Sequence, residues 1–273
     1  MVELKILYRK LMYIVVLLVI YVAICWWQRP RGLILTSTTY FDFAKEDHWV
    51  TFCKGIDSIL ELHDPATVGT IDHWLVINEW SAEPKADWST KIAAKYPFIE
   101  FVQKKQAEKG QARSLNMILE RIRPYEYWIH WEESWYASTP FLDRALHIMK
   151  TSHIDQLQIT TTDGQVDWSD HRGNICNNDY CIVHVEPSTL MLKSAYDVGK
   201  GERIPWWPPY SLRPSINRTA IYGRVGAFSE DPVLWPLWFE WDYGVRWFCA
   251  GGRKGILPDG PVTRSPKHVS TYG

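Results

Sequence analysis

The chain has 273 residues, enough for one large domain or two small ones with a substantial hydrophobic core. Its formal net charge is −1, so charge indicates neither a nucleic-acid partner nor an acidic one, and we expect no nucleic acid. Tryptophan is unusually abundant, with 16 residues. Some belong to the core, but clustered Trp and Tyr also line sugar-binding clefts, because a flat ring packs on the C–H face of a pyranose.

The N-terminal part of the chain predicts a membrane anchor. Residues 11–27 form a nearly continuous apolar run without charge, slightly shorter than the roughly 20 residues that usually span a bilayer. The alternative is a cleaved signal peptide, but the run is longer than a typical apolar signal core, and no small-x-small cleavage site follows it. Basic residues before the run favour a cytoplasmic N-terminus, although Arg29 and Arg31 after it oppose this.

We therefore expect a single-pass type II protein of the Golgi or another endomembrane, which meets the membrane through residues 11–27. Its parts are a cytoplasmic tail (1–10), the signal anchor (11–27), a short stalk (28–32) and one lumenal body (33–273).

Two short motifs fit a lumenal body. Cys176 and Cys181 bracket a four-residue stretch and either close a small disulfide loop or remain free thiols. The triplet NRT at 217–219 is an N-glycosylation acceptor, although such triplets are common by chance. No Cys/His spacing resembles a zinc site.

Strand and helix signals alternate from residue 32 onward. Apolar, β-branched runs predict strands, and apolar residues at helical spacing predict helices. We expect strands at 32–41, 71–81, 98–105 and 125–134, and helices at 48–63, 89–97, 110–124 and 140–152. This alternation predicts an α/β body with a mostly parallel sheet and helices on both faces.

The second half of the chain is less regular. Residues 156–164 and 181–193 read as strands, whereas the density of Pro and Trp in 204–218 and 226–252 predicts shaped loops with one helix at about 235–249.

In such sheets, ligands bind beyond the carboxyl ends of the strands. This rule places four polar strand tips in one crevice, at residues 36–39, 78–81, 104–105 and 132–133.

The order of these motifs resembles the GT-A nucleotide-sugar glycosyltransferases, especially their family 2-like group. The motifs are LTSTTYF (35–41), VINEWS (76–81), KGQARSLN (109–116) and WIHWEESWY (128–136). The resemblance implies a GT-A-like, Rossmann-like fold with a nucleotide-binding half (33–136) and an acceptor-binding half (137–273). It also implies inverting transfer of a hexose from a UDP- or GDP-sugar to a glycan, glycoprotein or glycolipid.

A metal site is implied at the end of the fourth strand. A divalent cation such as Mn²⁺ or Mg²⁺ would neutralise the diphosphate as the bond to the sugar breaks. Family members carry acidic residues at the first and third positions of this motif, but here the third is a serine. The implied ligands are Glu132, Glu133, Ser134 and a late histidine, His268. The alternative is a plain exposed turn and a histidine without function.

The resemblance also assigns residues to the donor, the base and the acceptor. The candidates for binding the nucleotide sugar are Thr36, Thr38, Asn78, Glu79, Lys109, Arg113 and Asn116, with capping of strand and helix ends as the alternative role. An inverting transferase needs a general base, for which Glu240 is the first candidate and Asp231 the second. Trp206, Trp207 and Arg213 are candidates for the acceptor platform, unless the two aromatic rings are simply packed.

Two other functions remain open. A catalytically inactive relative, acting as a carbohydrate-binding or scaffold protein, is favoured by Ser134. A glycoside hydrolase needs two carboxylates about 5–10 Å apart. Glu132 and Glu133 are poorly suited to this, because neighbours on a strand point to opposite faces, but a distant partner such as Glu240 is possible.

Overall fold

A computed structural model of the 273-residue chain describes residues 12–18, 31–42, 48–160, 175–183, 208–231 and 238–265. The chain divides into two compact units, Met1–Arg31 and Gly32–Gly273. Residues 12–18 are helical, and the rest of the predicted anchor lies outside the described residues. Within the described ranges, no helix has both the length and the apolar character needed to cross a bilayer. The tail, anchor and stalk therefore stay predictions.

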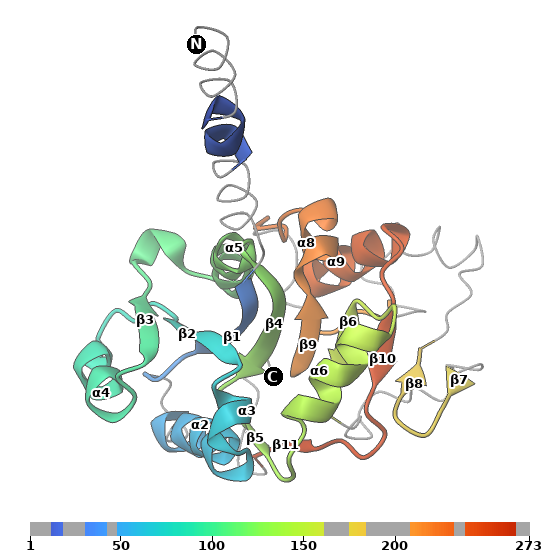
Figure 1. Ribbon diagram of the computed structural model, residues 1–273. Helices are drawn as coiled ribbons and strands as arrows, with labels where there is room; N and C mark the ends of the chain where they lie inside the picture. The colour runs from blue at the N-terminus through green and yellow to red at the C-terminus, as the bar shows by residue number, and fades with distance from the viewer. Residues whose placement is uncertain are drawn as a thin grey trace, which may run out of the picture. The chain divides into compact units, whose positions relative to one another are not determined.

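The first half of the larger unit alternates strands and helices (Figure 1). Its elements are β1 (Arg31–Thr39), α2 (His48–Leu62), α3 (Pro65–Val68), β2 (Ile71–Asn78), α4 (Trp88–Lys95), β3 (Ile99–Gln103), the 3-10 helix η1 (Gln106–Glu108), α5 (Gln111–Ile122) and β4 (Tyr125–Glu132).

The second half has shorter strands. Its described elements are β5 (Trp135–Ala137), α6 (Leu142–Thr151), β6 (Gln156–Gln158), β7 (Ile175–Cys176), β8 (Cys181–Ile182), β9 (Ser215–Arg218), α8 (Thr219–Val225), α9 (Trp238–Cys249), β10 (Lys254–Ile256) and β11 (Val262–Arg264).

The main sheet of the described residues has the strand order β3-β2-β1-β4-β9-β6-β10-β8-β7. β1, β2 and β3 are parallel neighbours, and β10 is parallel to β6. β9 runs antiparallel to both β4 and β6, which it separates. β5 and β11 form a small antiparallel sheet of their own. β1 lies between β2 and β4, so the strand order reverses its direction at β1. Ligands of α/β sheets bind at the carboxyl ends of the strands beside such a switch point.

Helices cover both faces of the sheet, and each face has its own apolar core (Figure 1). On one face, α2, α4 and α6 pack on side chains such as Leu35, Val76 and Ile129. On the other, α5, α8 and α9 pack on Ile34, Leu75 and their neighbours. Central strands buried on both faces need near-continuous apolar runs, which explains why their sequence pattern was clear.

The expected elements of the first half are confirmed to within a few residues, and so is the mixed α/β architecture. The disulfide between Cys176 and Cys181 forms and joins β7 to β8. Of the strands expected at 156–164 and 181–193, the structure describes β6 and β8 at their starts, and most of the remaining residues lie outside the described ranges.

Two expectations for the second half are wrong. The stretch 204–218 was expected to be irregular, but it ends in β9, which lies in the middle of the sheet. The inward side chains of β9 include Ser215 and Asn217, so it lacks the apolar pattern of a buried strand. Asn217 is completely buried, with its Nδ2 3.1 Å from Ser215 Oγ. The second wrong expectation is the glycosylation acceptor, because its asparagine, Asn217, is part of the interior.

Candidate active site

The tips of β1, β2 and β3 are joined by the side chain of Asn78. Its Oδ1 accepts hydrogen bonds from Thr39 Oγ1 at 2.9 Å and from the backbone N–H of Phe41 at 3.2 Å. Its Nδ2 donates to Gln103 Oε1 at 2.9 Å. Asn78 is completely buried, so these bonds use the amide for holding strands together. Asn78 shapes this edge of the sheet, and its amide is not presented to a ligand.

The two threonines predicted for donor binding lie in different environments. Thr36 is completely buried, and its hydroxyl donates to the carbonyl oxygen of Ile129 on β4 at 3.2 Å. Thr38 is half-buried and lies two residues nearer the carboxyl end of β1. Thr38 is thus the better placed of the two to meet a ligand.

Glu79 and Lys104 form a buried ion pair, with Lys104 Nζ 2.9 Å from Glu79 Oε2. Nζ also donates to the carbonyl oxygen of Gly110 and to Ser114 Oγ, both at 2.8 Å. Burial lowers the pKa of Lys104, and the Glu79 carboxylate opposes that effect. Glu79 accepts the Gly110 N–H at 3.1 Å as well, so the pair fixes the start of α5 to β2.

Gly110 precedes α5 with φ of 115°, a backbone conformation that favours glycine. Lys109 and Arg113 lie on either side of this turn and are exposed. Arg113 contacts Glu230, with an N–O distance of 3.3 Å. An exposed pair of this kind is easily exchanged for a phosphate, because it contributes little stability. Lys109 and Arg113 therefore remain candidates for binding the donor.

Asn116 binds another part of the protein. Its Oδ1 accepts the Phe228 N–H at 2.7 Å, and its Nδ2 donates to the Phe228 carbonyl oxygen at 3.0 Å. These two bonds tie α5 to the loop after α8. Asn116 therefore orients that loop, and its polar atoms are already used.

Glu132 and Glu133 have separate sets of partners. Glu133 is 8% exposed; its Oε1 lies 2.5 Å from His48 Nδ1, and its Oε2 accepts the Tyr40 N–H at 2.5 Å. Glu132 is half-buried, and its Oε2 accepts the indole N–H of Trp135 at 3.0 Å. Glu133 therefore joins α2 and β1 to the end of β4, and Glu132 is the carboxylate left near the crevice.

Glu240 lies in the first turn of α9, and its Oε1 accepts the backbone N–H of Leu212 at 2.9 Å. Burial raises the pKa of Glu240, opposed by the Leu212 N–H and by the charges of Lys254 and Arg213. A carboxylate with a raised pKa is a stronger base, as a general base requires. The structure thus gives Glu240 the environment expected of that role.

Glu132 and Glu240 are close enough for their charges to interact. Burial raises the pKa of Glu132 to about 7, and the charges of Glu240 and Glu133 act in the same direction. The Trp135 N–H and the positive charge of Arg264 oppose the shift. Two carboxyl groups far apart in the sequence therefore lie within electrostatic range of each other.

Cations accompany these carboxyl groups. Arg264 lies on β11 opposite Trp135, and its guanidinium carbon is 6.0 Å from the Trp135 ring centroid. Lys254 is buried on β10, and burial together with the charge of Arg213 lowers its pKa to about 7, against the effect of Glu240. We call Glu132, Glu240, Arg213, Lys254 and Arg264 the charge cluster.

The residues predicted to hold a metal were compared with what a divalent cation requires. Mg²⁺ and Mn²⁺ need several oxygen ligands in a regular arrangement. Both Glu133 oxygens are hydrogen-bonded, and Ser134 is only 2% exposed. Within the part of the chain that the structure describes, no group of three His, Cys, Asp or Glu side chains could hold an ion. Residues 132–134 therefore do not fit a divalent cation by themselves, and His268 lies outside the described residues.

The remaining predicted residues are placed only in part. Asp231 is exposed and directly precedes 232–237, which lie outside the described ranges. Trp206 and Trp207 also lie outside them, whereas Arg213 is half-buried.

The sequence reasoning missed three ionisable residues near the site, namely His130, Lys254 and Arg264, whereas it did place Lys104 at a strand tip. His130 is buried on β4, and burial lowers its pKa to about 4. One signal was an ionisable residue within or directly before a short apolar run, as for His130 of WIHW and Lys254 of KGIL.

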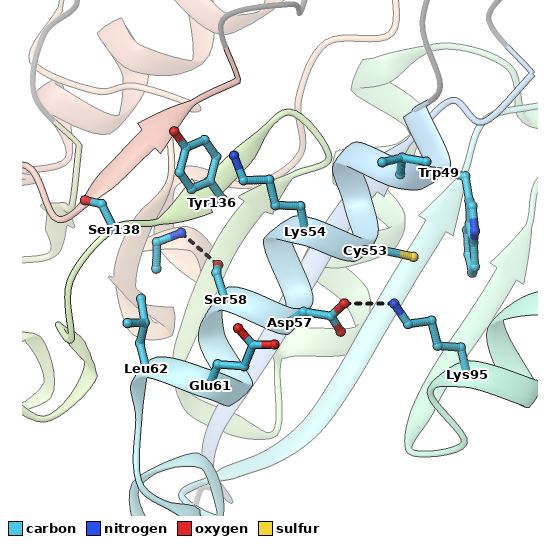
Figure 2. Close-up of a pocket in the computed structure, with 12 residues that line it drawn as sticks. Trp49, Cys53, Lys54, Asp57, Ser58, Glu61, Leu62, Lys95, Tyr136 and Ser138 are labelled. Carbon is cyan, nitrogen blue, oxygen red and sulfur yellow. Dashed lines mark hydrogen bonds and ion pairs between the residues drawn. The ribbon is translucent and has the colours of Figure 1, made fainter.

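A separate groove lies along α2 (Figure 2). It has a volume of about 720 Å³ and is lined by Trp49, Val50, Cys53, Lys54, Asp57, Ser58, Glu61, Leu62, Lys95, Tyr136, Ala137 and Ser138. Much of its charge is already satisfied: Lys95 Nζ is 2.8 Å from Asp57 Oδ2, and Lys54 Nζ is 3.3 Å from the Tyr136 ring centroid. None of the lining residues belongs to the charge cluster, so this groove is not the candidate active site.

Comparison with protein-family models and with curated proteins finds no match. Solved structures do match. Staphylococcus aureus TarS in complex with UDP-GlcNAc is 17% identical with a TM-score of 0.58, over 88% of this chain and 60% of that one. GalNAc-T7 with UDP, GalNAc and Mn²⁺ is 11% identical with a TM-score of 0.53, over 87% of this chain and 45% of that one.

This chain therefore covers less than two thirds of either of these proteins. At such identities the likeness shows the fold. Both neighbours are GT-A-type glycosyltransferases, and the chain has the GT-A fold of nucleotide-sugar glycosyltransferases.

Proposed function

We propose that the chain is a glycosyltransferase that moves a sugar from a nucleotide-sugar donor to a hydroxyl group of a glycan, glycoprotein or glycolipid. The observation that carries this proposal is the electrostatic proximity of Glu240, at the start of α9, to Glu132, at the end of β4 in a GT-A sheet. A UDP- or GDP-sugar is supported by the neighbours, since TarS binds UDP-GlcNAc and GalNAc-T7 binds UDP.

The nucleotide would bind over the tips of β1 and β2. Thr38 is the half-buried polar residue on β1 at this edge, and Asn78 keeps the neighbouring tips in register. The Lys104–Glu79 pair fixes the turn that presents Lys109 and Arg113. Two cations beside a helix start are suited to a diphosphate, because the backbone N–H groups of the first helical turn favour an anion.

Glu240 is the proposed catalytic base in an inverting displacement. The acceptor oxygen forms a bond to C1 of the sugar while the bond from C1 to the phosphate oxygen breaks, and that electron pair leaves with the nucleoside diphosphate. The acceptor's proton passes to the Glu240 carboxylate. The Leu212 N–H holds one carboxylate oxygen at 2.9 Å, which orients the group for this transfer. Asp231 is the second candidate for the base.

We also propose that residues 11–27 anchor the enzyme as a type II protein of the Golgi or another endomembrane. The apolar run and its basic N-terminal flank support this, and the Cys176–Cys181 disulfide fits an oxidising lumen. Protease digestion of sealed microsomes that carry the full chain tests this topology. We expect the body to be protected until detergent is added, and its digestion in intact vesicles would contradict the proposal.

The activity is tested by incubating the full chain with a panel of UDP- and GDP-sugars and measuring released nucleoside diphosphate, with and without glycan acceptors. We expect release with at least one donor, stimulation by an acceptor, and loss of release in Glu240→Gln. If sugars bind but no donor is turned over, the chain is instead a non-catalytic carbohydrate-binding relative.

A glycoside hydrolase is a second candidate, favoured by one observation. Glu132, with a pKa of about 7, is protonated enough to act as a general acid, and it lies beside a second carboxyl group, Glu240. Release of free sugar from a glycan in the absence of any nucleotide would support this function over transfer.

A further inference from the structure

The charge cluster contains more positive than negative groups. The positive charge of Arg264 favours the ionised form of Glu132, and the charges of Lys254 and Arg213 favour the ionised form of Glu240. Basic side chains of this kind can pair with an anion as well as with a carboxylate, and a guanidinium group does so with two parallel hydrogen bonds.

Arg264 gives an independent indication of a ligand. Its Nε is buried and has no hydrogen-bond partner among the residues that the structure describes. A buried donor of this kind is normally paired, and a guanidinium group matches the geometry of phosphate oxygens. Trp135 keeps the guanidinium group next to Glu132, because its ring faces Arg264 and its N–H binds Glu132.

Residues 132–134 offer little to a metal in comparison. The Glu133 oxygens bind His48 and Tyr40, and Ser134 is buried. Glu132 is then the one carboxylate of the three residues that is left for an ion, and it lies beside Arg264, whose charge repels a cation. The arrangement favours an anion at the position where the family holds a metal.

We propose that Arg264 supplies positive charge that stabilises the departing nucleoside diphosphate, in place of a divalent cation held by residues 132–134. This inference rests on the proposed glycosyl transfer. When the bond between C1 and the phosphate oxygen breaks, the electron pair and its negative charge move onto the diphosphate. Fixed cations placed there stabilise the transition state more than the ground state. Transfer then proceeds without added metal.

The test measures nucleoside diphosphate release by the full chain in excess EDTA and in excess Mn²⁺, using the donor found in the panel. The same experiment measures the affinity for UDP and GDP in EDTA by calorimetry. We expect release rates that agree within about threefold, a difference too small to reflect a lost ligand. We expect Arg264→Met to weaken binding of the preferred nucleotide roughly ten- to one-hundredfold, the loss expected for a charge-assisted hydrogen bond.

Two further variants control for folding. Arg144→Met removes an arginine paired with exposed Asp259 and leaves the site intact, so its affinity should equal that of the wild type. Arg264→Lys keeps the charge without the planar fork, so its affinity should lie between those of the wild type and Arg264→Met. Melting temperatures identify any variant that fails to fold. If Arg264→Met fails to fold, the affinity of Arg264→Lys is compared with that of the wild type instead.

Each outcome decides the proposal. Loss of release in EDTA with recovery in Mn²⁺ overturns it and leaves glycosyl transfer intact. Release in EDTA with unchanged nucleotide affinity in both Arg264 variants shows that the cation does not contact the diphosphate, which also overturns it. If neither UDP nor GDP binds under any condition and no donor is turned over, the proposed function fails and this inference fails with it.

Discussion

Lys104 and Glu79 form an ion pair inside the protein, with Nζ 2.9 Å from Oε2 and the lysine side chain fully buried. The remaining Nζ bonds go to Gly110 and Ser114, at the start of α5. The end of β2, which Glu79 directly follows, and the helix that carries Arg113 therefore share one fixed point. A change at this point should alter the stability of the fold and the geometry of the donor edge together.

Lys104→Met should destabilise the protein by about 1–3 kcal/mol, because it leaves the partly buried Glu79 carboxylate and the Gly110 carbonyl oxygen without their partner. Urea unfolding of the full chain measures the change. The control is Lys105→Met, which removes the exposed neighbouring lysine and should alter stability by no more than about 0.5 kcal/mol. Equal losses in the two variants would show that the buried pair has no special role.

Glu240→Gln should lower the turnover rate by about 10²–10⁴-fold and leave donor affinity nearly unchanged, because the base acts in the chemical step. The substituted amide retains an oxygen that can accept the Leu212 N–H, so the fold should be preserved. Asp242→Asn, two positions away on α9 and paired with Arg246, is the matched control and should remain active. Full activity of Glu240→Gln together with loss in Asp231→Asn would assign the base to Asp231.

The turnover rate should also depend on pH through Glu240. The base must be deprotonated to accept the acceptor's proton, and burial raises its pKa above the ordinary value of 4.5. Activity should therefore rise with pH through that raised pKa, and the residual activity of Glu240→Gln should lack this rise. A wild-type rate that falls over the same interval would contradict the assignment.

Glu132 should make stability depend on pH. Its pKa is raised from 4.5 to about 7 in the folded protein. Between these values the folded state binds more protons than the unfolded state, so this group's contribution to stability is present at low pH and is lost as the pH rises through the window. Glu132→Gln should remove that dependence, and its stability relative to the wild type should increase by about 3 kcal/mol between about pH 4 and pH 8. A constant difference between the two proteins would contradict the raised pKa.

Asn217 should carry no glycan when the full chain is made in a glycosylating cell. Its Oδ1 accepts hydrogen bonds from Gln156 Nε2 at 3.0 Å and from the Tyr222 hydroxyl at 2.6 Å, inside the sheet. Asn217→Ala should destabilise the protein by about 1–3 kcal/mol, because those donors lose their acceptor. Peptide mass mapping reports the glycan, and an occupied site would show that this strand is accessible before folding is complete.

The first half of the fold could be predicted because its central strands are buried on both faces and their helices have one apolar face. β9 could not, because Ser215 and Asn217 point into a polar part of the interior. Strand-end signals placed Glu132 among the candidates, and the family resemblance placed Glu240 there. They could not separate Glu132 from Glu133, because that difference depends on His48, which lies 85 residues away in the sequence.

The same limit applies to the other polar residues of the site. Asn78 has the residue type of a ligand-binding amide, but its partners Thr39 and Gln103 are on neighbouring strands and engage it completely. Lys254 and Arg264 lie late in the chain. The pairing of β10 with β6 and of β11 with β5 brings them to the charge cluster. Sequence patterns report the faces of single elements, whereas these roles are set by contacts between elements.

Hydrogen exchange of the full chain with and without UDP or GDP tests the central claim most directly, because it locates the nucleotide without assuming a reaction. We expect slower exchange at residues 38–42, 109–113 and 133–136 when the preferred nucleotide is added, and no change along α2 at residues 54–62. Protection confined to the groove along α2, or no protection at saturating concentrations of either nucleotide, would contradict the account.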